Sequence, residues 1–317
     1  MFSESPPAKR QRTESEDGSI TRSQMWISDG NVVLQASQMQ FRVHWSVLAR
    51  NSSVFRDMQG LPQPPDEPTI DGCPVVHLSD DPNDIGHLLE VLYTPTFLHR
   101  EKLKLPVIGA LIRLGCKYDF KDLFDAAVAR IMVECPTTLE DYDLVSDSFK
   151  NIEHYIGLDF DLISLASENI LAALPSAYYG AVTGFSLAGL FDGIQRDDGT
   201  VAHLGGLDLR RCVVAREKLL VKQFEPGYTL GWAQKWDFDG CENSAQCRTS
   251  RETVLRENLE CADIEALTRP FMVMFHEYCA PCARHVKACI AAGRRKIWEE
   301  LPDFFDLPPW SELENDM

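Results

Sequence analysis

The hydrophobic pattern of residues 39–55, MQFRVHWSVLARNSSVF, changes its period halfway along. Met39, Phe41 and Val43 alternate with polar residues, which is typical of a strand with one buried face. After His44 the apolar residues follow the spacing of short helical turns. Because neither glycine nor proline separates the two patterns, the strand must run directly into a helix. This joint predicts a compact α+β domain whose small sheet is wrapped by paired helices.

Two polar residues at this joint have predicted structural roles. We expect the ring nitrogens of His44 to hydrogen-bond backbone groups that are left unpaired where the strand ends and the helix begins. Ser53 is the predicted N-cap of the second of two short helices in residues 45–58. His44 is not expected to be a ligand or a catalytic base.

The periodicities divide the chain into three parts. Residues 1–25 are polar and charged, and we predict that they are disordered. Residues 26–135 alternate between strands and helices, with strands at 31–36, 39–43 and 75–78 and helices at 84–93, 105–118 and 121–134. In residues 136–317 strand signals nearly vanish, which predicts a mainly helical region. Its predicted helices are 139–147, 160–174, 176–182, 207–224, 250–258 and 270–300 in two pieces.

The charge balance bears on the kind of partner. The formal net charge is −17, and such an acidic surface repels phosphate, so we expect no direct nucleic-acid binding by the folded part. Residues 170–191 carry no charged side chain and approach the length of a membrane span. Prolines and glycines dilute this run, and Glu168 and Asp192 flank it without a basic anchor. We therefore expect buried helices there, with a membrane span as the minor alternative.

The first residues bear on the compartment. They lack an apolar core after their basic residues, so no signal peptide is predicted and the ten cysteines are expected as thiols or metal ligands. Lys9, Arg10 and Arg12 form a basic cluster of the type that nuclear import receptors bind. The cluster predicts a nuclear location, and a cytoplasmic one is the alternative if the tail is only solvated.

Several spaced signals surround the joint in a characteristic order. They are Asp29-Gly30-Asn31-Val32-Val33-Leu34, Phe41-x-Val43-His44-x-x-x-Leu48-Ala49-x-x-Ser52 with Phe55 and Met58, Val76-x-Leu78-x-Asp80, Leu88-Leu89-x-x-Leu92-Tyr93-Thr94, Leu111-x-x-Leu114-Gly115-x-Lys117-Tyr118 and Leu123-x-x-Ala126. Over about a third of the chain, this order resembles the BTB/POZ domain. Residues 209–220 and 298–308 resemble the helical extension of stand-alone BTB proteins that are abundant in fungi.

The resemblance implies a protein-interaction module without chemistry of its own. In agreement, the chain has no P-loop, no GxGxxG after a strand, no GxSxG and no HExxH, so no enzymatic activity is expected. BTB domains self-associate or bind partners, and a homodimer could form through an apolar patch of Trp26, Ile27, Trp45 and Val54, although core burial explains these residues equally well.

Two narrower functions are alternatives. One is a substrate adaptor of a cullin-type ubiquitin ligase, but residues 58–68 contain no clear match to the apolar-x-Glu docking motif of such adaptors. The other is a transcription-associated regulator, but no serial zinc-finger array follows residue 135.

Four of the cysteines form two pairs. Cys241-x5-Cys247 lies in a polar segment, 237–250, predicted to be a loop, and Cys279-x2-Cys282 lies between two helical patterns. In structural zinc sites with four thiolate ligands, one cysteine pair usually lies on a loop and the other at the start of a helix. The x5 spacing is wider than usual, and each of two histidines, His276 and His285, lies three residues from a cysteine of the tight pair and could replace a ligand.

Three interpretations of these pairs compete. A zinc ion bound by Cys241, Cys247, Cys279 and Cys282 predicts four sulfur atoms within about 4 Å of one another. A dithiol redox site is disfavoured because no thioredoxin-like βαβ pattern surrounds the CxxC. Buried free thiols are the third interpretation, as open as zinc for these four. For the remaining cysteines buried thiols are expected: Cys73, Cys116, Cys135, Cys212, Cys261 and Cys289.

Overall fold

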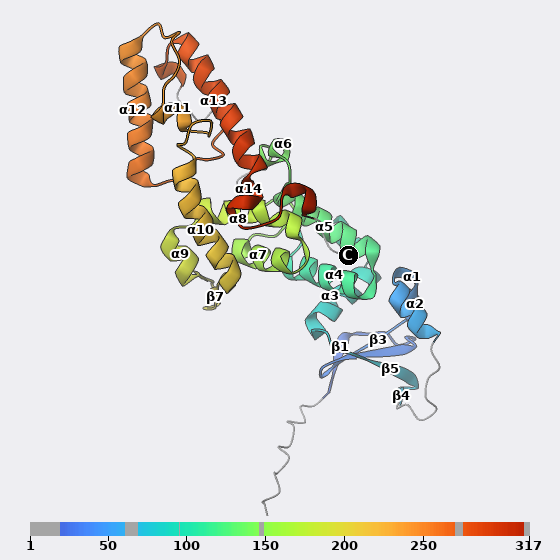
Figure 1. Ribbon diagram of the computed structural model, residues 1–317. Helices are drawn as coiled ribbons and strands as arrows, with labels where there is room; N and C mark the ends of the chain where they lie inside the picture. The colour runs from blue at the N-terminus through green and yellow to red at the C-terminus, as the bar shows by residue number, and fades with distance from the viewer. Residues whose placement is uncertain (1–19, 61–68, 95, 146–148, 270–274, 314–317) are drawn as a thin grey trace, which may run out of the picture. The chain divides into compact units, whose positions relative to one another are not determined.

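A computed structural model describes residues 20–60, 69–94, 96–145, 149–269 and 275–313 (Figure 1). The chain divides into two compact units, Met1–Tyr93 and Thr94–Met317, which are described separately below. The predicted fold class is confirmed, because a small sheet with helices is followed by a mostly helical region.

The first unit is built on a five-stranded sheet with the strand order β1-β3-β2-β5-β4. The central pair β2 and β3 is antiparallel, whereas β1 runs parallel to β3 and β5 runs parallel to β2. Asp71 and Gly72, with φ of 50° and 75°, form the two-residue turn between β4 and β5, where a type I′ turn requires positive φ at both positions. The strands are β1 (Thr21–Trp26), β2 (Val32–Ala36), β3 (Met39–Val43), β4 (Thr69–Ile70) and β5 (Cys73–Leu78).

Three helices accompany this sheet: α1 (Trp45–Asn51), α2 (Ser53–Gln59) and α3 (Pro82–Tyr93). The inward residues of the joint are buried as predicted, since Phe41, Val43, Leu48 and Phe55 are at most 1% exposed. Burying one such side chain contributes roughly 1.5–3 kcal/mol to folding. The change of period at the joint therefore marks the point where the core-facing residues pass from the sheet to the helices.

The polar contacts at the joint differ from the prediction. The backbone N–H of His44 donates to the hydroxyl of Tyr93 at 2.7 Å, and the N–H of Trp45 donates to Oδ1 of Asn31 at 2.7 Å. The ring of His44 contacts side chains rather than backbone groups, with Nδ1 3.1 Å from the Tyr93 hydroxyl and Nε2 3.4 Å from Oδ1 of Asp29. The unpaired backbone donors are thus satisfied by Tyr93 and Asn31.

Two further predictions are corrected in the first unit. The N-cap of α2 is Ser52, not Ser53, because the Ser52 hydroxyl accepts from the N–H of Phe55 at 3.0 Å. Strand β1 begins at Thr21, inside the segment 1–25 that was predicted to be disordered. Its polar residues hide the strand from a hydrophobicity argument, because an edge strand is stabilised mainly by backbone pairing, here with β3.

The second unit is mostly helical, with one short hairpin of β6 (Ile194–Gln195) and β7 (Val201–Ala202) that the sequence pattern did not predict. The predicted helix 139–147 stops at Tyr142, and the predicted helix 250–258 extends over Ser244–Cys261. In the part of the chain that the structure describes, none of the helices combines the length and apolarity that crossing a bilayer requires. The α-helices are α4 (Leu105–Tyr118), α5 (Lys121–Glu134), α6 (Leu139–Tyr142), α7 (Leu158–Asn169), α8 (Leu174–Gly184), α9 (Leu187–Asp192), α10 (Gly206–Lys222), α11 (Gly231–Gln234), α12 (Ser244–Cys261), α13 (Ala280–Glu299) and α14 (Leu301–Phe304), and the 3₁₀ turns are η1 (Phe97–His99), η2 (Leu171–Ala173), η4 (Phe275–Glu277) and η5 (Trp310–Glu312).

The long helix α13 contacts several separate parts of the second unit. The short helix α11 contacts both α12 and α13 (Figure 1). Near the middle of α13, Gly293 allows a close backbone approach, because a Cβ atom there would lie 2.3 Å from the backbone nitrogen of Thr229. Closer to its end, the indole N–H of Trp298 donates to the carbonyl of Thr137 at 3.2 Å. The packing of this helix therefore determines how distant segments meet.

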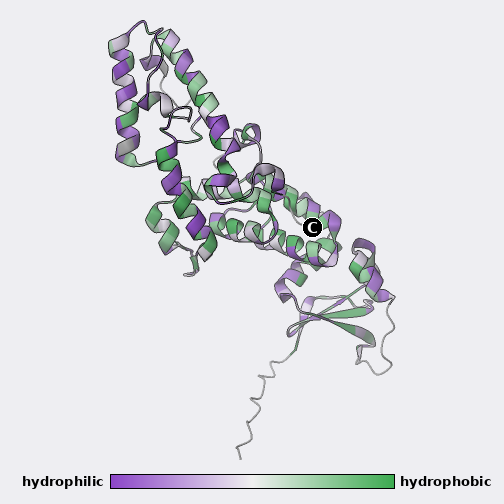
Figure 2. Ribbon diagram, viewed as in Figure 1, coloured by the Kyte–Doolittle hydropathy of each residue, from purple (hydrophilic) through white to green (hydrophobic). Residues whose placement is uncertain are grey.

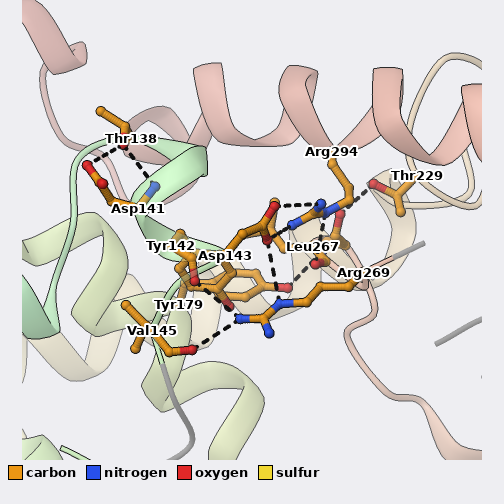
Figure 3. A network of polar contacts seen from close by, with 11 residues as sticks. Thr138, Asp141, Tyr142, Asp143, Val145, Tyr179, Thr229, Leu267, Arg269 and Arg294 are labelled. Atoms are coloured by element: carbon orange, nitrogen blue, oxygen red, sulfur yellow. Dashed lines mark hydrogen bonds and ion pairs between the residues drawn. The ribbon is translucent and has the colours of Figure 1, made fainter. Parts of the chain in front are cut away.

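An ion pair between a buried arginine, Arg294, and a half-buried aspartate, Asp143, lies at the centre of these contacts (Figure 3). Arg294 is 5% exposed, and its guanidinium binds both carboxylate oxygens of Asp143 while its Nε donates to the carbonyl of Leu267 at 3.2 Å. Arg269 contacts the same carboxylate at 3.5 Å and donates to the carbonyls of Tyr142 and Val145. The N–H of Leu267 donates to the hydroxyl of Tyr179. One carboxylate thus joins α13, the segment after α6 and the segment that carries Arg269.

We predict that Arg294→Ala lowers the free energy of unfolding by about 2 kcal/mol, because it removes the buried guanidinium and leaves the carbonyl of Leu267 without its donor, while the half-buried Asp143 keeps Arg269 as a partner. Arg295→Ala, at an exposed neighbour on the same helix, is the matched control and should change stability by less than about 0.5 kcal/mol. Urea denaturation followed by circular dichroism measures both. Equal stability of the two variants would contradict a structural role for the pair.

Candidate metal centre

The four paired cysteines converge from two separate segments in the last third of the chain. Cys241 precedes α12, and Cys247 lies in the first turns of that helix. Cys279 is the N-cap residue of α13, and Cys282 lies in its first turn. The predicted loop 237–250 is therefore partly wrong, because α12 begins at Ser244 and is capped by the side chain of Asn243. Helical geometry brings Cys247 back toward Cys241 in spite of the wide x5 spacing.

The geometry is that of a single cluster. The four cysteine sulfur atoms all lie within 4.8 Å of one another, and the sulfurs of Cys241 and Cys279 are 4.0 Å apart. Zn–S bonds of about 2.3 Å in a tetrahedron would place the sulfurs about 3.8 Å apart. All four are free thiols, with Cys247 and Cys282 buried and the other two half-buried. These four cysteines therefore lie within metal-binding distance of one another.

Backbone donors surround the cluster. The N–H of Cys279 donates to the sulfur of Cys247 at 3.2 Å, and the N–H of Glu242 donates to the sulfur of Cys279 at 3.4 Å. The N–H of Cys282 and that of Glu242 stabilise the thiolate of Cys279 and lower its pKa to about 6. Burial raises the pKa of Cys247 and of Cys282. The site combines one thiol that ionises readily with two whose ionisation requires a compensating charge.

An apolar core encloses the cluster on one side. Cys247 and Cys282 pack with Trp232, Tyr278 and Val286. The rings of Trp232 and Tyr278 are 6.0 Å apart in an edge-to-face arrangement. Burial, and then the negative charge of Glu277, raise the pKa of Tyr278. This core fixes the first turns of α13 relative to α12.

The two histidines considered as replacement ligands are not part of the cluster, which consists of cysteines. His285 stacks on Phe238 with ring centres 4.5 Å apart, and its Nε2 lies 3.5 Å from the sulfur of Cys289. His276 is exposed and lies in the turn η4. Their spacing from the CxxC suggested ligands, but helical geometry turns His285 toward the aromatic residues instead.

The other cysteines agree only in part with the buried-thiol prediction. Cys73, Cys135 and Cys212 are buried, and burial raises the pKa of Cys135 and of Cys212 to about 12. Cys116 and Cys261 are exposed, which corrects the prediction for them, and Cys289 is half-buried.

Comparison with known families identifies the first part of the chain. The family model of the BTB/POZ domain matches residues 25–131. This segment is a BTB/POZ domain. A comparison with curated proteins found no match. BTB/POZ domains are protein-interaction modules, so the segment has a general role in protein association. The resemblance inferred from the strand-to-helix joint is thereby confirmed, whereas the boundaries 26–135 and 136–317 stay predictions.

The residues predicted to form a BTB/POZ dimer patch differ in burial. Trp45 is 6% exposed and packs edge-to-face on Phe55, which places it in the core. Trp26, Ile27 and Val54 are half-buried. Residues 61–68, which include most of the segment compared with the cullin-docking motif, lie outside the described residues, as do Lys9, Arg10 and Arg12.

In metal-free protein, Cys279 should be alkylated faster than any buried thiol at neutral pH. Its lowered pKa of about 6 means that the thiolate fraction rises through pH 6 and is nearly complete at about pH 7, so the rate should level off there. Cys212, with its pKa raised to about 12, is the control and should stay unreactive. Mass spectrometry of iodoacetamide-treated, EDTA-washed protein at several pH values measures this. A rate at Cys279 that keeps rising between about pH 7 and 9 would contradict the assignment.

Proposed function

We propose that this protein is a non-enzymatic interaction protein whose BTB/POZ domain self-associates. The observation that carries the proposal is the family match over residues 25–131, joined to a sheet that ends in strand β1. A strand at the end of a sheet has backbone donors and acceptors on its outer side, which another chain can pair with. Ile20, which precedes β1, is 56% exposed, and Met25 and Trp26, in the last part of β1, are half-buried. An edge with apolar side chains beside it suits a second copy of the domain.

We predict that the full chain sediments as a dimer at micromolar concentration and that Ile20→Glu shifts it toward the monomer. The substitution places a charge beside the open edge, where it must be desolvated when a second chain pairs there. Leu144→Glu, at a 72% exposed site in the second unit, is the matched control. Sedimentation velocity over a concentration series measures the effect. A wild-type protein that stays monomeric, or two variants that dimerise alike, would contradict self-association through β1.

A monomeric result would favour the alternatives from the sequence, in which the BTB/POZ domain binds a different protein. A cullin scaffold would indicate a ubiquitin-ligase adaptor, and chromatin-bound proteins would indicate a transcription-associated regulator. Affinity purification from native extract with mass spectrometry separates these two. The nuclear location suggested by Lys9, Arg10 and Arg12 stays a prediction.

We further propose that Cys241, Cys247, Cys279 and Cys282 bind one structural zinc ion. Four convergent sulfurs with backbone N–H donors to two of them fit the tetrahedral, all-sulfur coordination that zinc accepts. If the cysteines were only buried free thiols, the half-buried Cys241 and Cys279 would have no reason to lie beside the buried sulfurs of Cys247 and Cys282. Zinc would hold the start of α12 against the start of α13, which supports a stabilising role rather than a catalytic one.

We predict about one equivalent of zinc in protein expressed with zinc supplementation and its loss in Cys282→Ser, with a lower melting temperature. Cys212→Ser is the control for a buried thiol outside the cluster: it should lose stability through packing but keep its zinc. Elemental analysis and thermal denaturation give the two readouts. Less than about half an equivalent of zinc in the wild type would favour the buried-thiol alternative.

A further inference from the structure

Exposed apolar side chains gather on two adjacent helices of the second unit. Leu187 and Phe191 on α9 are 47% and 55% exposed. On α10, which contacts α9, Leu207, Val214 and Val221 are 56%, 38% and 65% exposed. Figure 2 shows α9 as largely hydrophobic and α10 as a mixture of hydrophobic and hydrophilic segments. Large exposed apolar residues on neighbouring elements are typical of an interaction surface rather than of scattered surface residues.

The three residues on α10 form a stripe. Leu207, Val214 and Val221 are seven residues apart, which is nearly two helical turns, so they lie on one face. The opposite face is buried through Cys212 and Leu219. At a rise of about 1.5 Å per residue, the stripe is about 21 Å long, which is enough to contact about four turns of another helix.

Basic side chains accompany this stripe in an otherwise acidic chain. A groove of about 150 Å³ is lined by Arg210, Arg211, Val214 and Lys218 from α10 and by residues 304–306 at the end of α14. In the described parts of the chain, Arg210 and Lys218 form no ion pair. Nη2 of Arg211 donates to the carbonyl of Asp306 at 3.4 Å, which is a neutral partner. The groove therefore presents three cationic side chains beside one acidic lining residue, Asp306.

We propose that this surface, the α10 docking face (Leu207, Arg210, Arg211, Val214, Lys218 and Val221), binds an acidic amphipathic helix of a partner protein. Apolar residues of such a helix, repeated at i, i+3 or i+4 and i+7, would cover the stripe. Its carboxylates would pair with Arg210, Arg211 and Lys218. One occupant thus satisfies both the apolar and the charged parts of the face.

Charge makes two other occupants less suitable. A second copy would bring the three cations of the face against the same three cations, with Glu217 and Asp306 as the acidic residues beside them. A nucleic acid would match the cations but not the apolar stripe, and the net charge of −17 repels its phosphates beyond the face. The docking face lies within the second unit and does not depend on self-association through β1.

The test uses the full chain and a synthetic, fluorescently labelled peptide of about three heptads, long enough to form a helix on a surface. The peptide carries leucine at the contacting positions and glutamate beside them, and a matched peptide carries lysine in place of every glutamate. By fluorescence anisotropy, the acidic peptide should bind at least about tenfold more tightly than the lysine peptide, and added salt should weaken it.

Single substitutions locate the site. Val214→Glu and Lys218→Glu should each weaken binding of the acidic peptide by about tenfold or more, while Lys121→Glu, an equal charge change at an exposed residue of α5, should not. Circular dichroism checks that the variants are folded. If Val214→Glu does not fold, Lys218→Glu alone decides the test. Equal binding of the two peptides, insensitivity to both substitutions, or tighter binding of a single-stranded oligonucleotide would each overturn the proposal.

Discussion

The ion pair between Arg294 and Asp143 is the contact on which the second unit depends. It joins residues 151 positions apart in the sequence, and Arg269 contributes a second cation to the same carboxylate (Figure 3). An ion pair of this kind contributes little net stability by itself, but it tolerates few alternative arrangements, because a misplaced α13 would leave the buried Arg294 without a partner. We therefore interpret the pair as a device that selects one position of α13. The close approach at Gly293 acts together with it, since only a residue without a Cβ atom fits against Thr229.

Helix α13 connects these contacts to the candidate metal centre, because two of the four cysteines lie at its beginning. Cys279 is its N-cap and Cys282 lies in its first turn, between 11 and 15 residues before the contacts of Gly293 and Arg294. Because a helix is stiff over this length, roughly 20 Å, the two sulfurs are held in place by contacts far from them. The core of Trp232, Tyr278 and Val286 supports the same turn locally. The contacts of α13 thus fix the positions of Cys279 and Cys282. The position of the start of α12 then decides whether Cys241 and Cys247 lie close to them.

Local patterns predicted much of the fold and of the candidate site. The joint at His44 could be recognised because periodicity is a local signal, and the CxxC pair because its spacing alone sets the geometry. The partner of the His44 backbone could not be predicted, since Tyr93 lies 49 residues away and its hydroxyl follows no pattern. Strand β1 was missed because its stability comes from backbone pairing, and the start of α12 because its polar residues resemble a loop. No sequence pattern points from Asp143 to Arg294 either, because the two residues are 151 positions apart in the chain.

The composition of α12 argues for a metal at its beginning. This helix has 18 residues, yet among its described side chains only Cys247 and Ser250 are buried, with Val254 and Leu255 partly buried against the core. Most helices in proteins are stabilised by packing an apolar face, which α12 largely lacks. The hydroxyl of Ser250 donates to the carbonyl of Glu277 at 3.1 Å, so both buried residues attach the same end of α12 to the segment before α13. A zinc ion shared by Cys241, Cys247, Cys279 and Cys282 would supply at this end the stability that the apolar face does not provide. The uneven burial among the described side chains of α12 thus supports the proposed zinc site on grounds independent of the sulfur–sulfur distances.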